Sequence, residues 1–114
     1  MHLVLKKAGE IHAEPFDAGD GKISLVDIIG RPESAPFSGG MAEIWKSAPI
    51  EFEYDNDCAV CFMLEGEVTL TEGEESRTFE PGDVVFIPRR EGLKVVWESP
   101  SYGRFYYVTY PHWR

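Results

Sequence analysis

Glycine and proline divide this chain into short segments, and their spacing is the strongest constraint on its fold. The 11 glycines and 8 prolines are spread along 114 residues rather than gathered in one tract. The segments between them are rich in Val, Ile, Phe, Tyr and Thr, which favour β-strands. No window of about 12 residues keeps the 3.6-residue apolar period of a capped amphipathic helix. The pattern predicts an all-β sandwich or barrel.

Alternation and apolar runs place the expected strands between these breaks. The runs at residues 59–64 and 84–87 are continuously apolar, which is typical of buried strands, and Asp20-Gly21 is a strong turn signal. Residues 31–40 are expected to form a loop. The first 20 residues are the least patterned, and we expect residues 1–22 to form an N-terminal arm. The expected strands are residues 23–29, 41–46, 50–54, 59–64, 67–71, 76–79, 84–87, 93–97 and 104–110.

Charge and length narrow the classes of function. A chain of 114 residues predicts one domain. The net charge of −9 disfavours nucleic acid and anionic membranes as partners, since both reward clustered positive charge. No apolar run approaches the 18 or more residues that span a bilayer, and the apolar stretch after Met1 is too short for a signal peptide. Two cysteines are too few for a disulfide scaffold, so we expect a soluble cytoplasmic protein.

Two segments carry a family resemblance. Residues 62–68 (Phe-Met-Leu-Glu-Gly-Glu-Val) and 80–88 (Glu-Pro-Gly-Asp-Val-Val-Phe-Ile-Pro) resemble the two half-motifs of the cupin superfamily. Gly66 is similar to the glycine that closes the first motif, and Gly82 and Pro88 to the glycine and proline of the second. The resemblance implies a single cupin jelly-roll barrel over residues 1–114. Small cupins often pair their barrels, so we also expect a homodimer.

Within the superfamily the chain looks most like the EutQ cupins of ethanolamine utilisation. The aromatic-rich segment 104–110, followed by Pro111 and Trp113, resembles the EutQ ending, and Trp45 also fits that pattern. Small cupins similar to ureidoglycine aminohydrolase share Trp45 and the turn at Gly66 nearly as well. That branch is kept as an alternative.

Most cupins bind a divalent metal through histidines and a glutamate, and this sequence departs from that set. Its only histidines are His2, His12 and His112. We therefore expect no metal site of the usual cupin kind; weak binding through Glu43, Asp57 and water is the alternative, because carboxylates favour hard cations. Counting from the glycine turns, the family's ligand positions fall on Ala59, on Phe52 and Tyr54 or Glu53 and Asp55, and near Leu93.

Two acidic residues are the catalytic candidates. Asp57 stands just before the apolar run 59–64, where the mouth of a barrel would lie. Glu43 shares a strand face with Trp45 if the strand alternates. On the inner face Glu43 would be a buried general base with a raised pKa, and on the outer face an ordinary surface charge.

Cysteines, aromatic residues and arginines supply the binding candidates. Cys58 and Cys61 form a Cys-X-X-Cys pair, but residues three apart on a strand point to opposite faces, so Cys61 is expected to point into the barrel with Met63. The aromatic residues would line an apolar pocket or pack in the core. Arg104 would clamp an anion or pair with an acid, and Arg89 and Arg90 are candidate anion binders. The binding candidates are Trp45, Tyr54, Cys61, Met63, Arg89, Arg90, Trp97, Arg104 and Tyr106.

Three functions are compatible with these residues. The EutQ resemblance implies ethanolamine metabolism, possible association with a bacterial microcompartment and an acetate kinase-type phosphoryl transfer, which would use ATP and Mg²⁺. The second function is a metal-free module that binds a small molecule without turnover. The third is a scaffolding protein that contacts its partners through an acidic surface.

Overall fold

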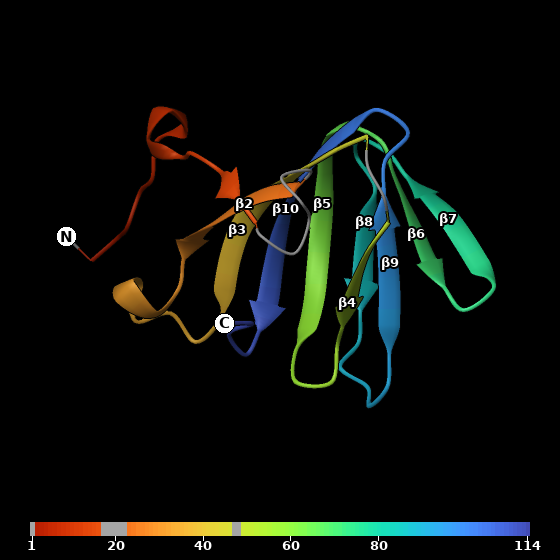
Figure 1. Cartoon of the computed structure of the whole chain (residues 1–114). Helices are drawn as coiled ribbons and strands as arrows, with labels where there is room; N and C mark the ends of the chain where they lie inside the picture. The colour runs from red at the N-terminus through yellow and green to blue at the C-terminus, as the bar shows by residue number, and fades with distance from the viewer. Residues whose placement is uncertain (1, 17–22, 47–48) are drawn as a thin grey trace.

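Two antiparallel sheets packed face to face make up the fold (Figure 1). The structure is a computed structural model that describes residues 2–16, 23–46 and 49–114. The six-stranded sheet has the order β1 (Glu14–Pro15), β2 (Ile23–Ile29), β3 (Ser38–Trp45), β10 (Tyr102–Tyr110), β5 (Cys58–Gly66), β8 (Val84–Ile87). The four-stranded sheet has the order β4 (Ile50–Glu53), β9 (Lys94–Glu98), β6 (Val68–Glu72), β7 (Glu75–Phe79).

The two sheets confirm the all-β prediction, with differences at the strand ends. β2 and β8 have the expected bounds, whereas β3 begins at Ser38 and so includes residues assigned to a loop. β1 was not expected, because two residues are too short to show a period. It pairs with β2 and holds the end of the N-terminal segment against the six-stranded sheet. The predicted turn at Asp20-Gly21 lies outside the described residues.

Helical structure is limited to short turns in the described part of the chain. η1 (Ala8–Glu10) and η3 (Arg31–Glu33) are single 3-10 turns. No helix among the described residues is long and apolar enough to cross a membrane.

The two motif glycines form tight turns. Gly66 has φ +73°, and a Cβ at this position would lie 2.0 Å from the Tyr102 carbonyl oxygen. Gly82 has φ +90° and lies inside a turn in which the Asp83 carboxylate accepts the Glu80 N–H at 2.9 Å. Only glycine adopts this backbone without strain, so both residues act where the resemblance placed them.

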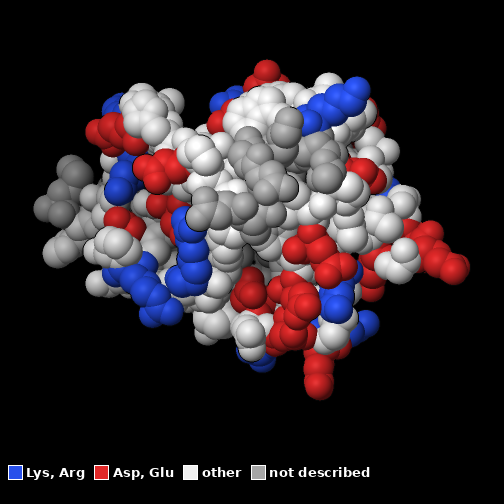
Figure 2. Space-filling view, in the orientation of Figure 1, with Lys and Arg blue, Asp and Glu red and all other residues white. Residues whose placement is uncertain are grey.

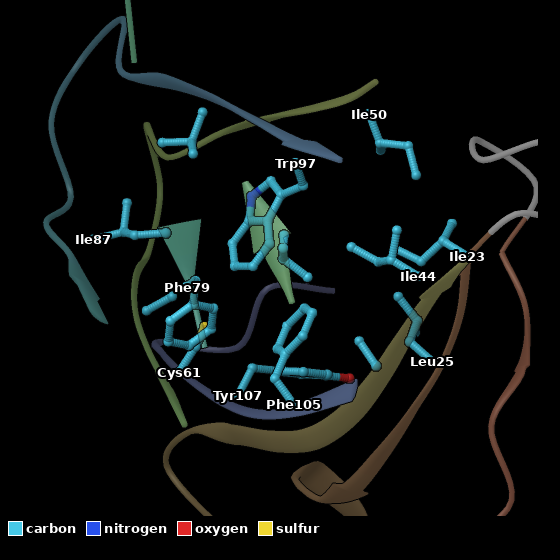
Figure 3. Close-up of a cluster of buried hydrophobic side chains, with 14 of the residues drawn as sticks. Ile23, Leu25, Ile44, Ile50, Cys61, Phe79, Ile87, Trp97, Phe105 and Tyr107 are labelled. Atoms are coloured by element: carbon cyan, nitrogen blue, oxygen red, sulfur yellow. The ribbon is translucent and has the colours of Figure 1, made fainter. Parts of the chain in front are cut away.

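The core lies between the inner faces of the two sheets (Figure 3). On β5 the buried positions alternate, so that Ala59, Cys61 and Met63 point inward as expected. Trp97 of β9 stacks on Phe105 of β10, with ring centroids 4.9 Å apart. This contact joins the two sheets near the middle of the barrel.

Two strands expected to be buried are covered on one face only. Val84 is 60% exposed and Phe86 is 64% exposed, although both lie in the apolar run of β8. Phe62 on the neighbouring strand β5 is 42% exposed. The expectation of buried strands is therefore correct for the inner face and wrong for the outer face.

Candidate functional site

A cavity of ≈ 210 Å³ lies between the two sheets, at the end of the barrel where β4 leads into β5. Its wall is mainly apolar, with a few polar groups near the opening. Such a composition is typical of sites for small organic molecules. The wall is formed by Ile23, Leu25, Ala42, Ile44, Phe52, Glu53, Tyr54, Asn56, Asp57, Ala59, Cys61, Trp97, Phe105, Tyr107, Thr109 and Trp113.

Asp57 differs from the other polar groups in the wall because it is a largely buried carboxylic acid with a raised pKa. It is only 9% exposed, and burial raises the pKa of its carboxyl group without any compensating hydrogen bond among the described residues. A buried carboxylate is costly to leave without a partner. Asp57 is thus available to a ligand that brings a hydrogen-bond donor or a positive charge.

Tyr54 and Cys61 line the same cavity in their protonated forms. Burial raises the pKa of the Tyr54 phenol, and the nearby Cys61 and Asp57 add to the effect. Burial also raises the pKa of the Cys61 thiol to about 12. Near neutral pH, Cys61 is therefore a poor nucleophile, since the thiolate is the reactive form, and Tyr54 offers a neutral hydroxyl.

Trp97 adds an unused donor to the cavity wall. Its indole is 3% exposed. Its buried Nε1–H makes no hydrogen bond of good geometry with a described residue. The indole lies near the Tyr54 hydroxyl. Burial raises the pKa of Tyr54, and the indole has the smaller, opposite effect. Buried donors are nearly always paired, so this one is a candidate contact for a ligand acceptor.

A hydrogen-bond network around Asp27 lies behind one part of the cavity wall, since Tyr107 and Trp113 belong to both. Its Oδ1 accepts the Tyr107 hydroxyl at 2.6 Å and the Trp113 indole N–H at 2.8 Å, and its Oδ2 accepts the Arg114 Nε–H at 2.8 Å. Burial alone would raise the pKa of Asp27, but these three donors outweigh it and hold the pKa below its usual value. A Cβ at Gly40 would lie 2.3 Å from the Tyr107 hydroxyl, so this arrangement requires glycine there.

Four of the site candidates selected from the sequence line the cavity, namely Tyr54, Asp57, Cys61 and Trp97. The other candidates lie elsewhere. One of these, Met63, is buried in the core without reaching the cavity.

Four further candidates lie on the outer face of the six-stranded sheet. Glu43 accepts a hydrogen bond from the Tyr102 hydroxyl, and burial together with Glu43 raises the pKa of Tyr102 to about 12. Trp45 packs on Tyr102, with ring centroids 5.7 Å apart. Arg104 pairs with Glu65 at 3.4 Å, and Tyr106 is 41% exposed. The sequence left open whether Glu43 and Trp45 point to the inner or the outer face of the sheet. They point to the outer face, so they lie apart from the cavity.

The two adjacent arginines stand on the loop between β8 and β9, which is hydrogen-bonded to Tyr54 of the cavity wall. Arg89 and Arg90 are exposed, and the Arg90 backbone N–H donates to the Tyr54 carbonyl oxygen at 3.0 Å. The loop is held further by the Gly92 N–H, which donates to the Asp55 carboxylate at 2.6 Å. Their side chains can reach an anion outside the cavity, but they are not part of its wall.

The family's metal-ligand positions coincide with the cavity. Ala59, Phe52, Glu53 and Tyr54 all line it, so the counting from the glycine turns found the correct region. Together they supply one carboxylate and no imidazole, which does not fit a metal held by histidines. Within residues 2–16, 23–46 and 49–114, no group of three His, Cys, Asp or Glu side chains is placed to hold a metal ion.

Several cavity residues were not among the selected site residues. Thr109 lies near the end of β10, Trp113 lies after β10, and Asn56 lies in the loop before β5. The Asp27 network was also missed. A single aspartate inside the apolar run Leu25-Val26-Asp27-Ile28-Ile29 is a signal that could have found it, because a buried charge requires partners.

The sequence profile of the EutQ-like cupin domain matches residues 33–106, well over half of the chain. The chain belongs to the EutQ-like cupin family. Among curated proteins it is 30% identical over 101 residues to acetate kinase EutQ of Salmonella typhimurium strain LT2, and 28% identical over 85 residues to acetate kinase EutQ of Clostridioides difficile strain 630. These alignments cover 87% and 75% of the chain, but only 39% and 52% of the two relatives.

Solved structures show the same fold. An ethanolamine utilization protein Q from Salmonella typhimurium LT2 superposes with a TM-score of 0.86 at 21% identity, over 96% of this chain and 87% of that chain. The EutQ protein of Clostridium difficile gives 0.82 at 22% identity, over 97% and 82%. The polyketide cyclase RemF from Streptomyces resistomycificus gives 0.82 at 18%, over 95% and 79%. At these identities the likeness shows the cupin fold alone.

Proposed function

We propose that this EutQ-like cupin acts in ethanolamine metabolism by binding a small organic molecule in the barrel cavity, with Asp57 as the anchoring group. One observation carries the proposal, namely a buried carboxylate without a partner among the described residues in the wall of a ≈ 210 Å³ cavity. The names of the relatives support the metabolic setting. The proposal includes a cytoplasmic location and association with a bacterial microcompartment.

The chemistry of the wall favours a small amine. Two carboxylates belong to the wall, whereas no lysine or arginine does among the described residues. Glu53 pairs with Lys94 at 3.7 Å, so Asp57 is the one that is left to a ligand. The indole ring of Trp97 adds a face that attracts a cation. Apolar cavities of about 150 Å³ hold a molecule the size of benzene, so a four-atom amino alcohol fits with room to spare.

Isothermal titration calorimetry with ethanolamine tests this proposal. A ligand of four non-hydrogen atoms gains at most about 6 kcal/mol, so we expect a dissociation constant no tighter than about 40 μM. Ethylene glycol, which replaces the amine with a hydroxyl group, is the matched ligand and should bind at least about 10-fold more weakly. Binding should weaken as the pH falls through the raised pKa of Asp57, because protonation removes its charge.

Two variants control the titration. Asp57→Asn removes the charge with little change of shape and should weaken ethanolamine binding by about 10-fold or more. Glu51→Gln removes an exposed carboxylate of β4 outside the cavity wall and should leave binding unchanged. Equal binding by wild type and Asp57→Asn contradicts the proposal, and so does equal binding of ethanolamine and ethylene glycol.

A second candidate function, acetate kinase-type phosphoryl transfer, is favoured by the loop that carries Arg89 and Arg90 and is hydrogen-bonded to Tyr54 of the cavity wall. Acetate is small enough for the cavity, while ATP is far larger, so its phosphates would lie outside near Arg89 and Arg90. An acetate oxygen would attack the γ-phosphorus, the bond to the β-phosphate oxygen would break, and ADP would leave with that electron pair. Mg²⁺ would neutralise the charge on the phosphates.

A coupled assay for acetyl phosphate, with ATP, Mg²⁺ and acetate, tests this second function. The variant Arg89→Ala/Arg90→Ala should lose about 100-fold or more of the activity, since phosphate clamps make large contributions to phosphoryl transfer. Arg77→Ala, on exposed strand β7, is the matched control and should retain full activity. Activity no higher than that of a blank preparation contradicts the kinase function and leaves the binding proposal standing.

A further inference from the structure

A second cavity, of ≈ 410 Å³, is lined by Asp27 itself, whereas the Tyr107 and Trp113 side chains that donate to Asp27 line the barrel cavity. The two cavities share no wall residue. The wall of the second cavity comes mainly from three segments far apart in the sequence, which are the N-terminal arm, the end of β2 with η3, and the residues after β10. We name this cavity the tail cleft. Its charged and titratable wall residues are Lys6, Asp27, Arg31, Glu33, His112 and Arg114.

The wall of the tail cleft is positive in a chain that is negative overall. Its three cationic side chains outnumber its two carboxylates, which leaves one net positive charge before the imidazole of His112 is counted. The whole chain carries a net charge of −9. In Figure 2 basic side chains gather at the lower left, where η3 and the C-terminal residues lie in Figure 1, while acidic side chains project from the tip of the β6–β7 hairpin on the right. The local reversal of charge favours an anionic ligand in this cleft.

Both carboxylates of the tail cleft already have partners within the protein. Asp27 accepts the three hydrogen bonds described above. Glu33 accepts the Gly30 N–H at 2.7 Å and lies 3.5 Å from Lys6 Nζ, and these contacts hold the pKa of Glu33 below its usual value. Neither carboxylate lacks a partner, so the cleft does not call for a cation.

The two arginines of the tail cleft keep donors for a ligand. Arg114 is held in place, because its Nε–H donates to Asp27 at 2.8 Å and its guanidinium lies 4.6 Å from the centre of the Trp113 ring. Its two terminal nitrogens donate to no described residue. Arg31 forms no ion pair with the described part of the chain. Guanidinium groups bind phosphate oxygens through parallel N–H donors, so two of them in one cleft suit an oxyanion.

The donors of the tail cleft approach from different sides. Lys6 comes from the N-terminal arm, Arg31 from η3, and Arg114 from the residues after β10. His112 is fixed by its Nε2–H, which donates to the Ala35 carbonyl oxygen at 2.8 Å, and its Nδ1 remains as a further polar atom. A tetrahedral phosphate group has oxygens that point in several directions, whereas a planar carboxylate is satisfied by one guanidinium.

We propose that the tail cleft is a binding site for a phosphate group, free or on a small organic molecule. Cavities of about 150 Å³ hold a molecule the size of benzene, so the tail cleft has room for a phosphate group and several further atoms. The site is separate from the barrel cavity, and Asp27 and Trp113 connect the two.

A titration with inorganic phosphate, followed by ¹H–¹⁵N NMR of the indole N–H groups, tests the proposal. Chloride keeps the ionic strength constant, so that general screening does not change. Trp113 reports the tail cleft, because the Arg114 guanidinium lies over its ring and its N–H donates to Asp27. We expect a saturable shift of Trp113 with a dissociation constant of about 1 to 10 mM. Trp97, which lines only the barrel cavity, should not shift.

Two further ligands identify the group that binds. Ethyl phosphate carries the phosphate group on an organic tail. Tighter binding of ethyl phosphate identifies a phosphate ester as the ligand class, and tighter binding of inorganic phosphate identifies the free ion. Succinate offers only planar carboxylates and should bind about 10-fold more weakly or worse. Equal binding of succinate and inorganic phosphate overturns the proposal.

Substitutions of Arg31 locate the site without touching the Asp27 network. Arg31→Ala should weaken phosphate binding by about 10-fold or more. Arg31→Lys keeps the charge but loses the parallel donors, so it should restore only part of the affinity. Arg77→Ala removes an exposed arginine of β7 and should bind phosphate as the wild type does. Circular dichroism should give the native spectrum for all three variants, since both arginines are exposed.

Three results overturn the proposal. The first is a Trp113 signal that stays unchanged up to about 100 mM phosphate. The second is equal binding by the wild type and Arg31→Ala. The third is a joint shift of Trp97 and Trp113, which places the phosphate in the barrel cavity. None of them bears on ethanolamine binding, which the calorimetric titration measures separately.

Discussion

Asp27 and Asp57 are both substantially buried acids at the barrel, yet their surroundings have opposite effects. Asp27 accepts hydrogen bonds from three side chains, which hold its pKa below the usual value. Asp57 accepts none from the described residues, and burial raises its pKa. The first carboxylate contributes to stability, whereas the second, in the cavity wall, is available to a ligand.

The contrast follows from where the hydrogen-bond donors come from in the sequence. Tyr107, Trp113 and Arg114 belong to β10 and the segment after it, which crosses the end of β2. Asp57 lies in a short loop between β4 and β5, and it accepts no hydrogen bond from the described part of that segment, although Thr109 and Trp113 line the same cavity. Binding sites commonly retain groups that are unfavourable for stability, and Asp57 in the cavity wall fits that rule.

Replacing Asp27 should have the largest effect on stability. Asp27→Asn removes the charge shared by three hydrogen bonds and should lower the free energy of unfolding by about 2–3 kcal/mol at pH 7. Urea denaturation measures the loss. A loss below about 0.5 kcal/mol, which is typical of an ordinary surface substitution, would contradict the stabilising role of Asp27.

The loss of stability in Asp27→Asn should depend on pH in a direction that follows from the lowered pKa of Asp27. Because the folded pKa of Asp27 is lowered, its contribution is complete above the unfolded value near 3.8 and is lost as the pH falls through the folded value. The difference between wild type and Asp27→Asn should therefore be constant from pH 7 to about pH 5 and should shrink below about pH 4. A difference that grows on acidification would contradict the network.

Removing the hydroxyl groups of the adjacent residues Tyr106 and Tyr107 should change the free energy of unfolding by different amounts. Tyr107→Phe removes the hydroxyl that donates to Asp27 and should lower the free energy of unfolding by about 1–2 kcal/mol. Tyr106→Phe, on the outer face, should change it by less than about 0.5 kcal/mol. Denaturation of both variants in parallel measures the pair, and equal losses would show that the hydroxyl of Tyr107 has no structural role.

The smallest effect on stability is expected at Asp57. The folded pKa of Asp57 is raised, so its ionisation opposes folding at neutral pH, and this cost disappears as the pH falls toward 3.8. Asp57→Asn should therefore be neutral or stabilising by up to about 1 kcal/mol at pH 7, with the difference narrowing in acid. A thermal melt series over pH measures it. Strong destabilisation would make Asp57 a structural residue like Asp27.

The strands and the inward side chains followed from the sequence because they depend on local pattern. Short apolar runs between turn signals placed β2, β5 and β8, the two-residue period of a strand gave the inward positions of β5, and the motif glycines placed the turns. Asp57 was selected because a strand begins next to it. Tyr54 and Trp97 were also found among the candidates.

The facing of β3 and β10 and the Asp27 network could not be predicted from local pattern. Glu43 and Arg104 alternate with apolar residues, and a period of two is the same for either face. The donors to Asp27 lie 80 or more residues away in the sequence, so only the fold brings them together. The Asp57 cavity also depends on residues from both sheets.

The three tryptophans give the most direct test of the cavity as a binding site. Trp97 and Trp113 line the cavity, whereas Trp45 lies on the outer face of β3. In a titration with ethanolamine followed by ¹H–¹⁵N NMR of the indole N–H groups, the account predicts saturable shifts of Trp97 and Trp113 and no shift of Trp45. In Asp57→Asn the same shifts should need about 10-fold more ethanolamine or more. Unchanged signals from Trp97 and Trp113, or shifts at the same ethanolamine concentration in Asp57→Asn, would contradict it.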